Sequence, residues 1–222
     1  MSRPVVTTRG GGGTLHEAFR ELKRRGPQVL VTGDVPETVS RRATRRLLGH
    51  PDEDRHRVVA LTDSDAVGEA WFPDGYTPDD DGVSLIGEHE LRGSALVGDA
   101  VDDRAGDTLV DRIDHEVRRR QPDDETLPPA VIRVGVYSLE TLLETQGIEA
   151  VRELAYRLTG EVRRARGMGH YHLPRAPGSE AVTDLQFVFD ARLELRTAAG
   201  GPEQRWHLPG QGTTNWVALG QL

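Results

Sequence analysis

Short apolar runs alternate along the chain with segments that carry one apolar helical face. Val29–Thr32 and Val58–Leu61 are almost wholly apolar, as are strands buried on both faces of a parallel sheet. The segment between them, from about Pro36 to Leu48, ends at Gly49, and we predict a capped helix there. Alternation of this kind restricts the chain to an α/β fold with a largely parallel central sheet flanked by helices.

The same alternation continues after a loop-rich region, residues 63–106, in which only Val83–Ile86 and Ser94–Val97 resemble strands. The segments that follow predict a helix at Asp107–Arg120, a strand at Ala130–Val136, helices at Leu139–Thr145 and Ile148–Arg166, a strand at Met168–Leu173 and a helix around Glu180–Phe187.

The C-terminal part of the chain has the alternating pattern of antiparallel strands. Ala191–Thr197 and Arg205–Leu208 are joined through Ala198-Ala199-Gly200-Gly201, which predicts a C-terminal antiparallel hairpin. Asn215–Leu219 is a candidate last strand.

The N-terminal segment, Met1–Gly13, ends in four glycines, Gly10–Gly13. Thr14 and Glu17 then form a capping box, which predicts a helix that begins at Thr14 and ends at Gly26. A chain of 222 residues suits one large domain. We therefore predict a disordered glycine-rich tail over residues 1–13 and a single domain over residues 14–222.

Lysine is almost absent from a strongly charged chain. Of the 28 basic residues only Lys23 is a lysine, and the net charge is −8. High salt screens the self-repulsion of such a surface, so the composition predicts a halophile, with a GC-rich genome that favours arginine codons as the alternative. Nucleic acid is a disfavoured partner, because binding by counterion release weakens as salt rises.

Composition also excludes several classes of protein. There is no cysteine, which rules out disulfides and thiolate metal sites. The apolar runs are far shorter than the roughly 20 residues of a membrane span, and Met1–Gly13 has no hydrophobic signal region. We expect a cytoplasmic protein without a membrane partner.

The loop after the first strand has the length and context of a P-loop, Gly-x-x-x-x-Gly-Lys-Ser/Thr. In that register Gly33 matches the first glycine and Ser40 matches the magnesium-binding hydroxyl. Thr38 replaces the second glycine, and Val39 replaces the lysine. The register therefore predicts a vestigial nucleotide loop.

The remaining residues of this loop oppose phosphate binding. Pro36 removes one backbone N–H group, and Asp34 and Glu37 place carboxylates where an anion would lie. The alternative to a vestigial site is an ordinary turn, with proline and acidic residues at a helix N-terminus.

A P-loop ATPase also needs an aspartate at the end of a later strand to hold the magnesium shell. Here Tyr137 follows the apolar run Ala130–Val136. A phenol is neutral near pH 7 and is a poor magnesium ligand. A second part of the ATPase machinery is therefore absent from the sequence.

Several segments in the second half of the chain are informative when they are considered together. Val136–Leu139 is followed by a short helix and then by Ile148–Arg166, Phe189–Arg196 has an aspartate–apolar–Glu–Leu pattern, and Arg205–His207 follows it. This set resembles the Asp-Ser-Leu segment, late strand and returning strand of RecA-superfamily ATPases of the KaiC type. With Leu22 and Thr213–Trp216, it resembles degenerate KaiC-like proteins of halophilic archaea.

The resemblance covers about residues 14–219 and implies a RecA/KaiC-like fold. It also implies a catalytic glutamate just after the second core strand, where this chain has the shorter acids Asp63 and Asp65. The departures at Thr38, Val39 and Tyr137 remove the ATPase activity that the family would otherwise imply.

Two further groups of side chains have open interpretations. His170 and His172 share one face of a strand, where they could act as metal ligands or be buried in the core. No third metal ligand is near them in the sequence. The arginines Arg41, Arg42, Arg45 and Arg46 form a basic stripe that is either an interaction surface or a solvated helix face. Trp206 and Trp216 likewise belong either to the core or to an interaction surface.

These observations favour a catalytically inactive RecA/KaiC-like domain that acts as a regulatory or protein-interaction module. We expect another protein as partner, no cofactor, no metal, and a monomer or dimer. The alternative is a weak nucleotide-binding sensor or ATPase that uses Ser40, Asp63 or Asp65. A DNA-associated regulator is a distant third alternative.

Overall fold

The computed structural model describes residues 17, 21–22, 24–62, 68–87, 104–121 and 127–220. The predicted tail over residues 1–13, the strand Ser94–Val97 and the positions of Asp63 and Asp65 lie outside these residues. Within the described part, no helix has the length and hydropathy that crossing a bilayer requires.

The described strands form one sheet in the order β3-β2-β4-β5-β1-β6-β7-β8, with β9 paired to β7. The strands from β3 to β6 along this order are parallel, and β7, β8 and β9 are antiparallel to their neighbours. Their bounds are β1 Gln28–Thr32, β2 His56–Leu61, β3 Val83–Ile86, β4 Ile132–Tyr137, β5 Met168–Leu173, β6 Ala191–Ala198, β7 Gly201–Leu208, β8 Gly212–Thr213 and β9 Val217–Ala218. The predicted α/β class and the C-terminal hairpin are confirmed.

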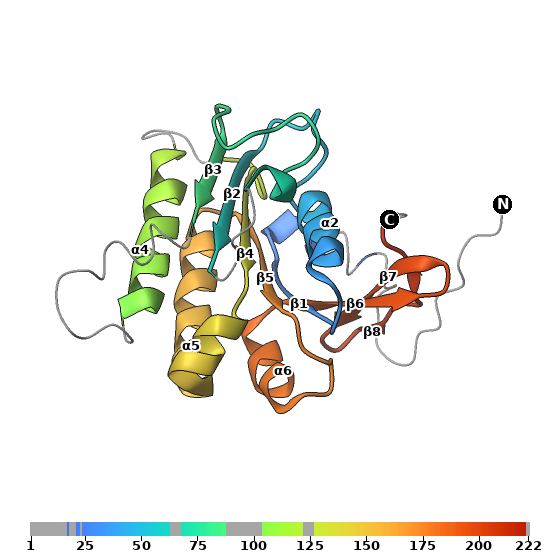
Figure 1. The fold of residues 1–222 in the computed structure, drawn as a ribbon. Helices are drawn as coiled ribbons and strands as arrows, with labels where there is room; N and C mark the ends of the chain where they lie inside the picture. The colour runs from blue at the N-terminus through green and yellow to red at the C-terminus, as the bar shows by residue number, and fades with distance from the viewer. Residues whose placement is uncertain are drawn as a thin grey trace.

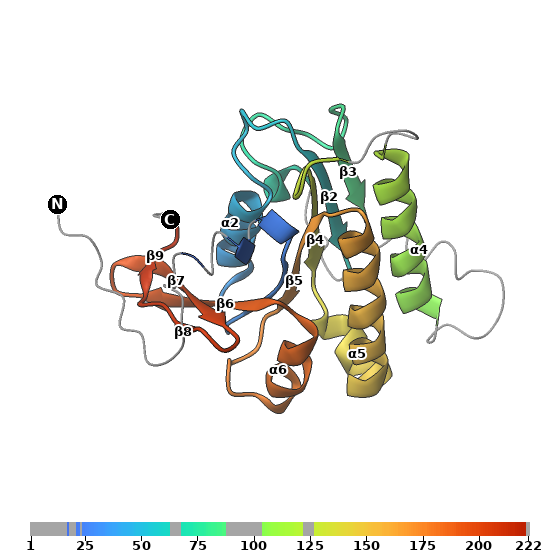
Figure 2. The ribbon, with the colours of Figure 1, turned by 180° about the vertical axis from the view of Figure 1, so that it is seen from behind.

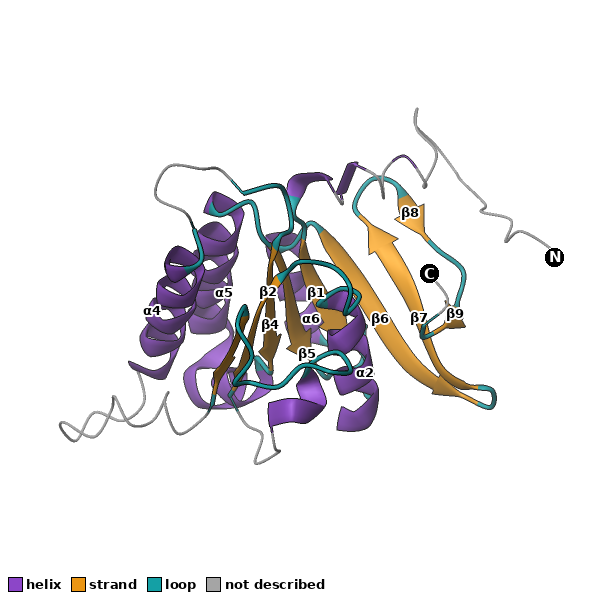
Figure 3. Cartoon of the chain, turned by 90° about the horizontal axis from the view of Figure 1, so that it is seen from above, coloured by secondary structure: helices purple, strands orange, loops and turns teal. Residues whose placement is uncertain are grey.

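Helices cover both faces of the parallel strands (Figures 1 and 3). Their bounds are α2 Glu37–Leu47, the 3₁₀ turn η1 Gly68–Trp71, α4 Arg104–Arg119, α5 Glu140–Arg164, α6 Glu180–Leu185 and the 3₁₀ turn η2 Gln186–Val188. The elements α4, α5 and α6 share one core with the sheet, and α2 and η1 pack on the opposite face. The β6–β7 hairpin lies at the end of the sheet remote from α4 (Figure 2).

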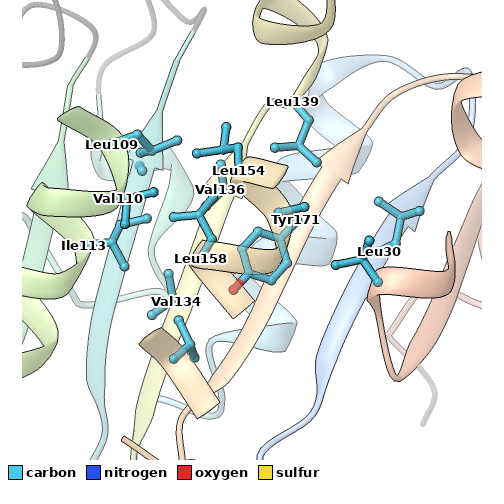
Figure 4. Close-up of a cluster of buried hydrophobic side chains, with 14 of the residues drawn as sticks. Leu30, Leu109, Val110, Ile113, Val134, Val136, Leu139, Leu154, Leu158 and Tyr171 are labelled. Carbon is cyan, nitrogen blue, oxygen red and sulfur yellow. The ribbon is translucent and has the colours of Figure 1, made fainter. Parts of the chain in front are cut away.

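Strand periodicity explains this division. In β4 the side chains of Val134 and Val136 join the α4–α5 core, and the alternate residue, Tyr137, packs with η1 on the α2 face. Figure 4 shows side chains of α4, α5 and the strands meeting in the larger core, among them Leu109, Val110, Ile113, Leu154 and Leu158.

The two helices predicted around residue 147 are confirmed as the two helical segments of α5, which meet at a kink where Gly147 has the non-helical angles φ 81° and ψ 174°. The predicted end of α2 at Gly49 is also confirmed, since α2 ends at Leu47 and Gly49 has a positive φ of 94°. At its N-terminus α2 has no side-chain cap, because Pro36 occupies the N-cap and no side chain there accepts a hydrogen bond from the first turn.

Candidate functional site at the carboxyl edge of the sheet

Ligands of open α/β sheets bind where the exit loops of adjacent strands turn to opposite faces. In this protein β1 leads into α2 on one face, and its neighbour β5 leads into α6 on the other face. The carboxyl ends of β1 and β5, with their exit loops, are therefore the candidate ligand site.

A backbone hydrogen bond joins the two exit loops. The Gly33 N–H donates to the carbonyl of Arg175, 2.9 Å away in the β5–α6 loop. The Val35 N–H turns back to the Gly33 carbonyl at 3.0 Å. Two amides of the vestigial nucleotide loop are thus hydrogen-bonded within the protein.

Packing against β6 requires a glycine at position 33. Its φ is 132°, and a Cβ atom at this position would lie 2.2 Å from the Leu195 carbonyl oxygen of β6. Only glycine accommodates both the backbone angle and this close approach. Packing against β6 therefore accounts for the glycine without a phosphate.

The other residues of the vestigial loop lie in the first turn of α2. Val39, at the position of the P-loop lysine, is 6% exposed and packs in the apolar cluster between α2 and the sheet. Ser40 is also buried, whereas Thr38 is exposed. Glu37 forms an ion pair with Arg41. A longer side chain at position 39 would have to enter the core.

Tyr137 occupies the position of the magnesium aspartate and is packed among aromatic rings. Its ring centroid lies 4.4 Å from that of Trp71 in η1 and 5.6 Å from that of His172 in β5. The Thr62 N–H donates to the Tyr137 carbonyl at 2.8 Å, and the Ser138 N–H donates to Thr62 Oγ1 at 2.9 Å. The peptide bond between Tyr137 and Ser138 is cis.

The two histidines of β5 are completely buried under α2. His172 Nε2 shares a hydrogen bond with the Thr44 hydroxyl at 2.9 Å, and the two imidazole centroids are 5.7 Å apart. Both nitrogens of His170 lack a hydrogen-bond partner among the described residues. Gly135 makes room for the ring, because a Cβ there would lie 2.6 Å from His170 Nε2.

Burial determines the charge of this pair. Desolvation lowers the pKa of His172 to about 3, and burial together with His172 lowers the pKa of His170 well below its ordinary value. Both rings are therefore neutral near pH 7. The residues that the structure places contain no group of three His, Cys, Asp or Glu side chains suited to a metal ion.

The predicted arginine stripe separates into two pairs. Arg41 lies 5.5 Å from the ring of Trp71, and Arg45 pairs with Asp74 at 3.4 Å, so both face η1 and the loop after it. Arg42 is exposed near Gly220, and its charge contributes, after desolvation, to lowering the pKa of Arg46. The two pairs of arginines therefore have different neighbours.

The two predicted tryptophans lie on opposite faces of the hairpin. Trp206 pairs with Leu193 of β6 and packs against the α2-side core. The guanidinium carbons of Arg196 and Arg205 lie 4.0 and 4.5 Å from the ring centroid of Trp216.

A charged cluster centred on Glu194 shares Arg205 with Trp216. Glu194, which is 4% exposed, accepts two hydrogen bonds from Arg205 at 2.9 and 3.0 Å and contacts His207 Nε2 at 2.6 Å. Arg192 approaches the same carboxylate at 3.7 Å. Desolvation acts to raise the pKa of Glu194, but the hydrogen bonds and charges of Arg205 and His207 together outweigh it, so the pKa is lowered from its ordinary value.

Sequence reasoning missed Arg175, Glu140, Thr62 and Trp71. Arg175, in the loop after β5, forms an ion pair with Glu140, the first residue of α5, and the distance from Arg175 Nε to Glu140 Oε1 is 2.7 Å. No spacing in the sequence relates these two residues. Strand order is the signal that would have found them, because it places the β5 exit loop beside Gly33.

Comparison with known proteins yields one family. Residues 26–195 match the model of a family of unknown function, DUF7504. No curated protein matches the chain. The matched region runs from the residue before Pro27 and β1 to Leu195 in β6, so it contains the whole carboxyl edge described above. Because this region is more than half of the sequence, the chain belongs to the DUF7504 family.

Proposed function

We propose that this protein is a RecA/KaiC-like domain that has lost ATP hydrolysis and acts as a regulatory or protein-interaction module. The observation that carries the proposal is the hydrogen bond from the Gly33 N–H to the Arg175 carbonyl. It holds the first residue of the vestigial P-loop register against the β5–α6 loop, so the segment is bonded to the protein itself at the position where a phosphate loop begins.

The charges around the loop support the same conclusion. Phosphoryl transfer requires cations at the β- and γ-phosphates. The loop instead carries Asp34 and Glu37, Val39 is buried in the core, and Tyr137 is packed between Trp71 and His172. Neither a phosphate-binding lysine nor a magnesium carboxylate is present at these positions.

Exposed aromatic side chains support a role in protein interaction. Phe187 in η2 is 79% exposed and Tyr156 in α5 is 56% exposed, and these two elements contact each other. Large aromatic residues in such positions are typical of binding hot spots. A partner that covers Phe187 would remove apolar surface from water.

One observation favours the alternative function, a weak nucleotide sensor. No side chain caps the first turn of α2, so its N-terminal dipole could still attract an anion. The carboxylate of Glu37 opposes such binding. A genuine weak site should therefore bind ATP more tightly after Glu37→Gln, whereas the module should bind ATP in neither form.

Calorimetry with Mg-ATP in molar KCl, combined with phosphate release, tests the proposal. We expect no binding heat and no hydrolysis above background for the native chain and for Glu37→Gln. Light scattering should show a monomer or dimer with and without Mg-ATP. Hydrolysis, or a hexamer that appears only with ATP, would overturn the proposal.

The interaction role has its own test. Affinity capture from a high-salt lysate should recover a protein with the native chain and with Asp184→Ala, an exposed control on the neighbouring helix α6. Phe187→Ser should lose that protein. Equal recovery with both variants would remove Phe187 from the interface.

A further inference from the structure

Hydrogen bonds link the carboxyl ends of four neighbouring strands, β2, β4, β5 and β1. The Thr62 N–H of the β2 exit donates to Tyr137 at 2.8 Å, and the Leu139 N–H of the β4 exit donates to His172 at 2.8 Å. The Gly33 N–H of the β1 exit donates to Arg175 at 2.9 Å. The carboxyl edge is therefore linked from β2 through to β1.

The link between Gly33 and Arg175 spans the switch point between β1 and β5. The two loops that it joins lead to opposite faces of the sheet. The Arg175 N–H donates to the Leu173 carbonyl at 2.7 Å, which bends the chain sharply after β5. This bend aims the Arg175 carbonyl at Gly33.

The side chain of Arg175 fixes the bend from outside. Its Nε lies 2.7 and 2.9 Å from the two carboxylate oxygens of Glu140, and its Nη2 lies 2.6 Å from Oε1. The side chains are 35% and 23% exposed, so solvent screens the pair only in part. Glu140 is the first residue of α5, where a carboxylate is also favoured by the helix dipole.

We propose that the Glu140–Arg175 ion pair is a clasp that holds the β5–α6 loop against Gly33 and so keeps the Gly33 N–H bonded to the Arg175 carbonyl. Breaking the pair frees the Arg175 carbonyl to move, and the Gly33 N–H then becomes open to solvent. This inference goes beyond the proposed function, because the clasp acts on the Gly33 hydrogen bond whether or not the domain binds a partner.

Amide hydrogen exchange of Gly33, followed by NMR on the full chain, tests the clasp. Arg175→Ala and Glu140→Gln should each accelerate Gly33 exchange by about three- to tenfold, the factor expected from a partly shielded bidentate pair. The exchange of Leu30, inside the β1–β5 ladder, should stay unchanged. Arg163→Ala, which breaks the Arg163–Asp190 pair at the other end of α5, is the control and should leave Gly33 unchanged.

The charge-swapped double variant Glu140→Arg/Arg175→Glu separates the pair from side-chain bulk. Restored slow exchange of Gly33 in this variant supports the clasp. The proposal is overturned if neither single variant accelerates Gly33, or if Leu30 accelerates as much as Gly33, which would indicate general destabilisation. Glu140→Gln preserves the shape of the side chain and stays informative if Arg175→Ala fails to fold. None of these outcomes depends on ATP hydrolysis, so they leave the proposed function to its own test.

Discussion

Val39 and Thr38 are adjacent in α2 but face different surroundings. Val39 is 6% exposed in the apolar cluster with Leu193, and Thr38 is exposed. Restoring the P-loop lysine by Val39→Lys should cost about 3–5 kcal/mol of stability, because an unpaired charge enters the core. Thr38→Lys adds the same charge at the surface and should change stability by about 0.5 kcal/mol or less.

Thermal melting of the two variants checks this prediction. Val39→Lys should lower the melting temperature by about 6 °C or more, and Thr38→Lys should leave it nearly unchanged. Equal melting temperatures would mean that position 39 reaches solvent, and the argument against a phosphate site would weaken.

The buried histidines predict loss of stability in mild acid. Their folded-state pKa values lie below the unfolded value of about 6.5, and that of His172 is about 3. The unfolded chain therefore binds more protons between these values, so their contribution is complete above pH 6.5 and decreases as the pH falls toward 3. Each histidine should contribute a slope of up to about 1.4 kcal/mol per pH unit in this range.

Denaturant unfolding between pH 7 and 5.5 measures that slope before most carboxylates titrate. His170→Gln should remove about half of it. His50→Gln, at a largely exposed ring, is the control and should leave it in place. A flat stability profile in the native protein would show that the pair is not buried and neutral.

Within the β6–β7 hairpin, the two glutamates have different roles. Glu194 is buried beside Arg192, Arg205 and His207, whereas Glu203 pairs with Arg196 nearer the surface. Glu194→Gln should destabilise the protein by about 1–3 kcal/mol, because it leaves half-buried guanidinium groups without their shared carboxylate. Glu203→Gln should cost less than about 1 kcal/mol. Urea unfolding of both variants measures the two changes in the free energy of unfolding. Equal losses of stability in the two variants would contradict a central role for Glu194.

Element positions were largely predictable from the sequence because they depend on local patterns. Apolar runs located β1, β2 and β3, and helical spacing located α2 and α5. β4 begins two residues later than predicted, where Ala130 has a positive φ of 60°. β7 begins earlier than predicted, since Gly201–Gln204 lacks an apolar pattern yet pairs with β6 across a tight turn.

The candidate site was predictable only in part, because much of it depends on strand order. The P-loop register located Gly33 and Val39 from sequence alone. The contact of Gly33 with Arg175 requires β5 to lie beside β1, and no local pattern encodes that non-local pairing. Likewise, sequence spacing grouped the four arginines of α2 but gave no information about Asp74 or Trp71, which hold two of them.

The whole molecule carries a net charge of −8, and this predicts that stability rises with salt. Raising ionic strength from about 0.1 to 1 M shortens the Debye length from about 10 to 3 Å and reduces repulsion in the folded state. We expect a higher melting temperature in molar KCl. The double variant Asp79→Asn/Asp81→Asn removes two exposed charges and should show a smaller salt effect. A melting temperature that is flat or falls with KCl would contradict the prediction.

The group that accepts the Gly33 N–H at the carboxyl edge of the sheet is a main-chain carbonyl, that of Arg175. Replacing Arg175 can alter how firmly its carbonyl is held, but every amino acid at position 175 brings a carbonyl that can accept the Gly33 N–H. Point substitutions alone therefore do not recreate a phosphate cradle. An engineer who wants one must also change the length or path of the segment between β5 and α6, so that its main chain no longer bonds to the Gly33 N–H.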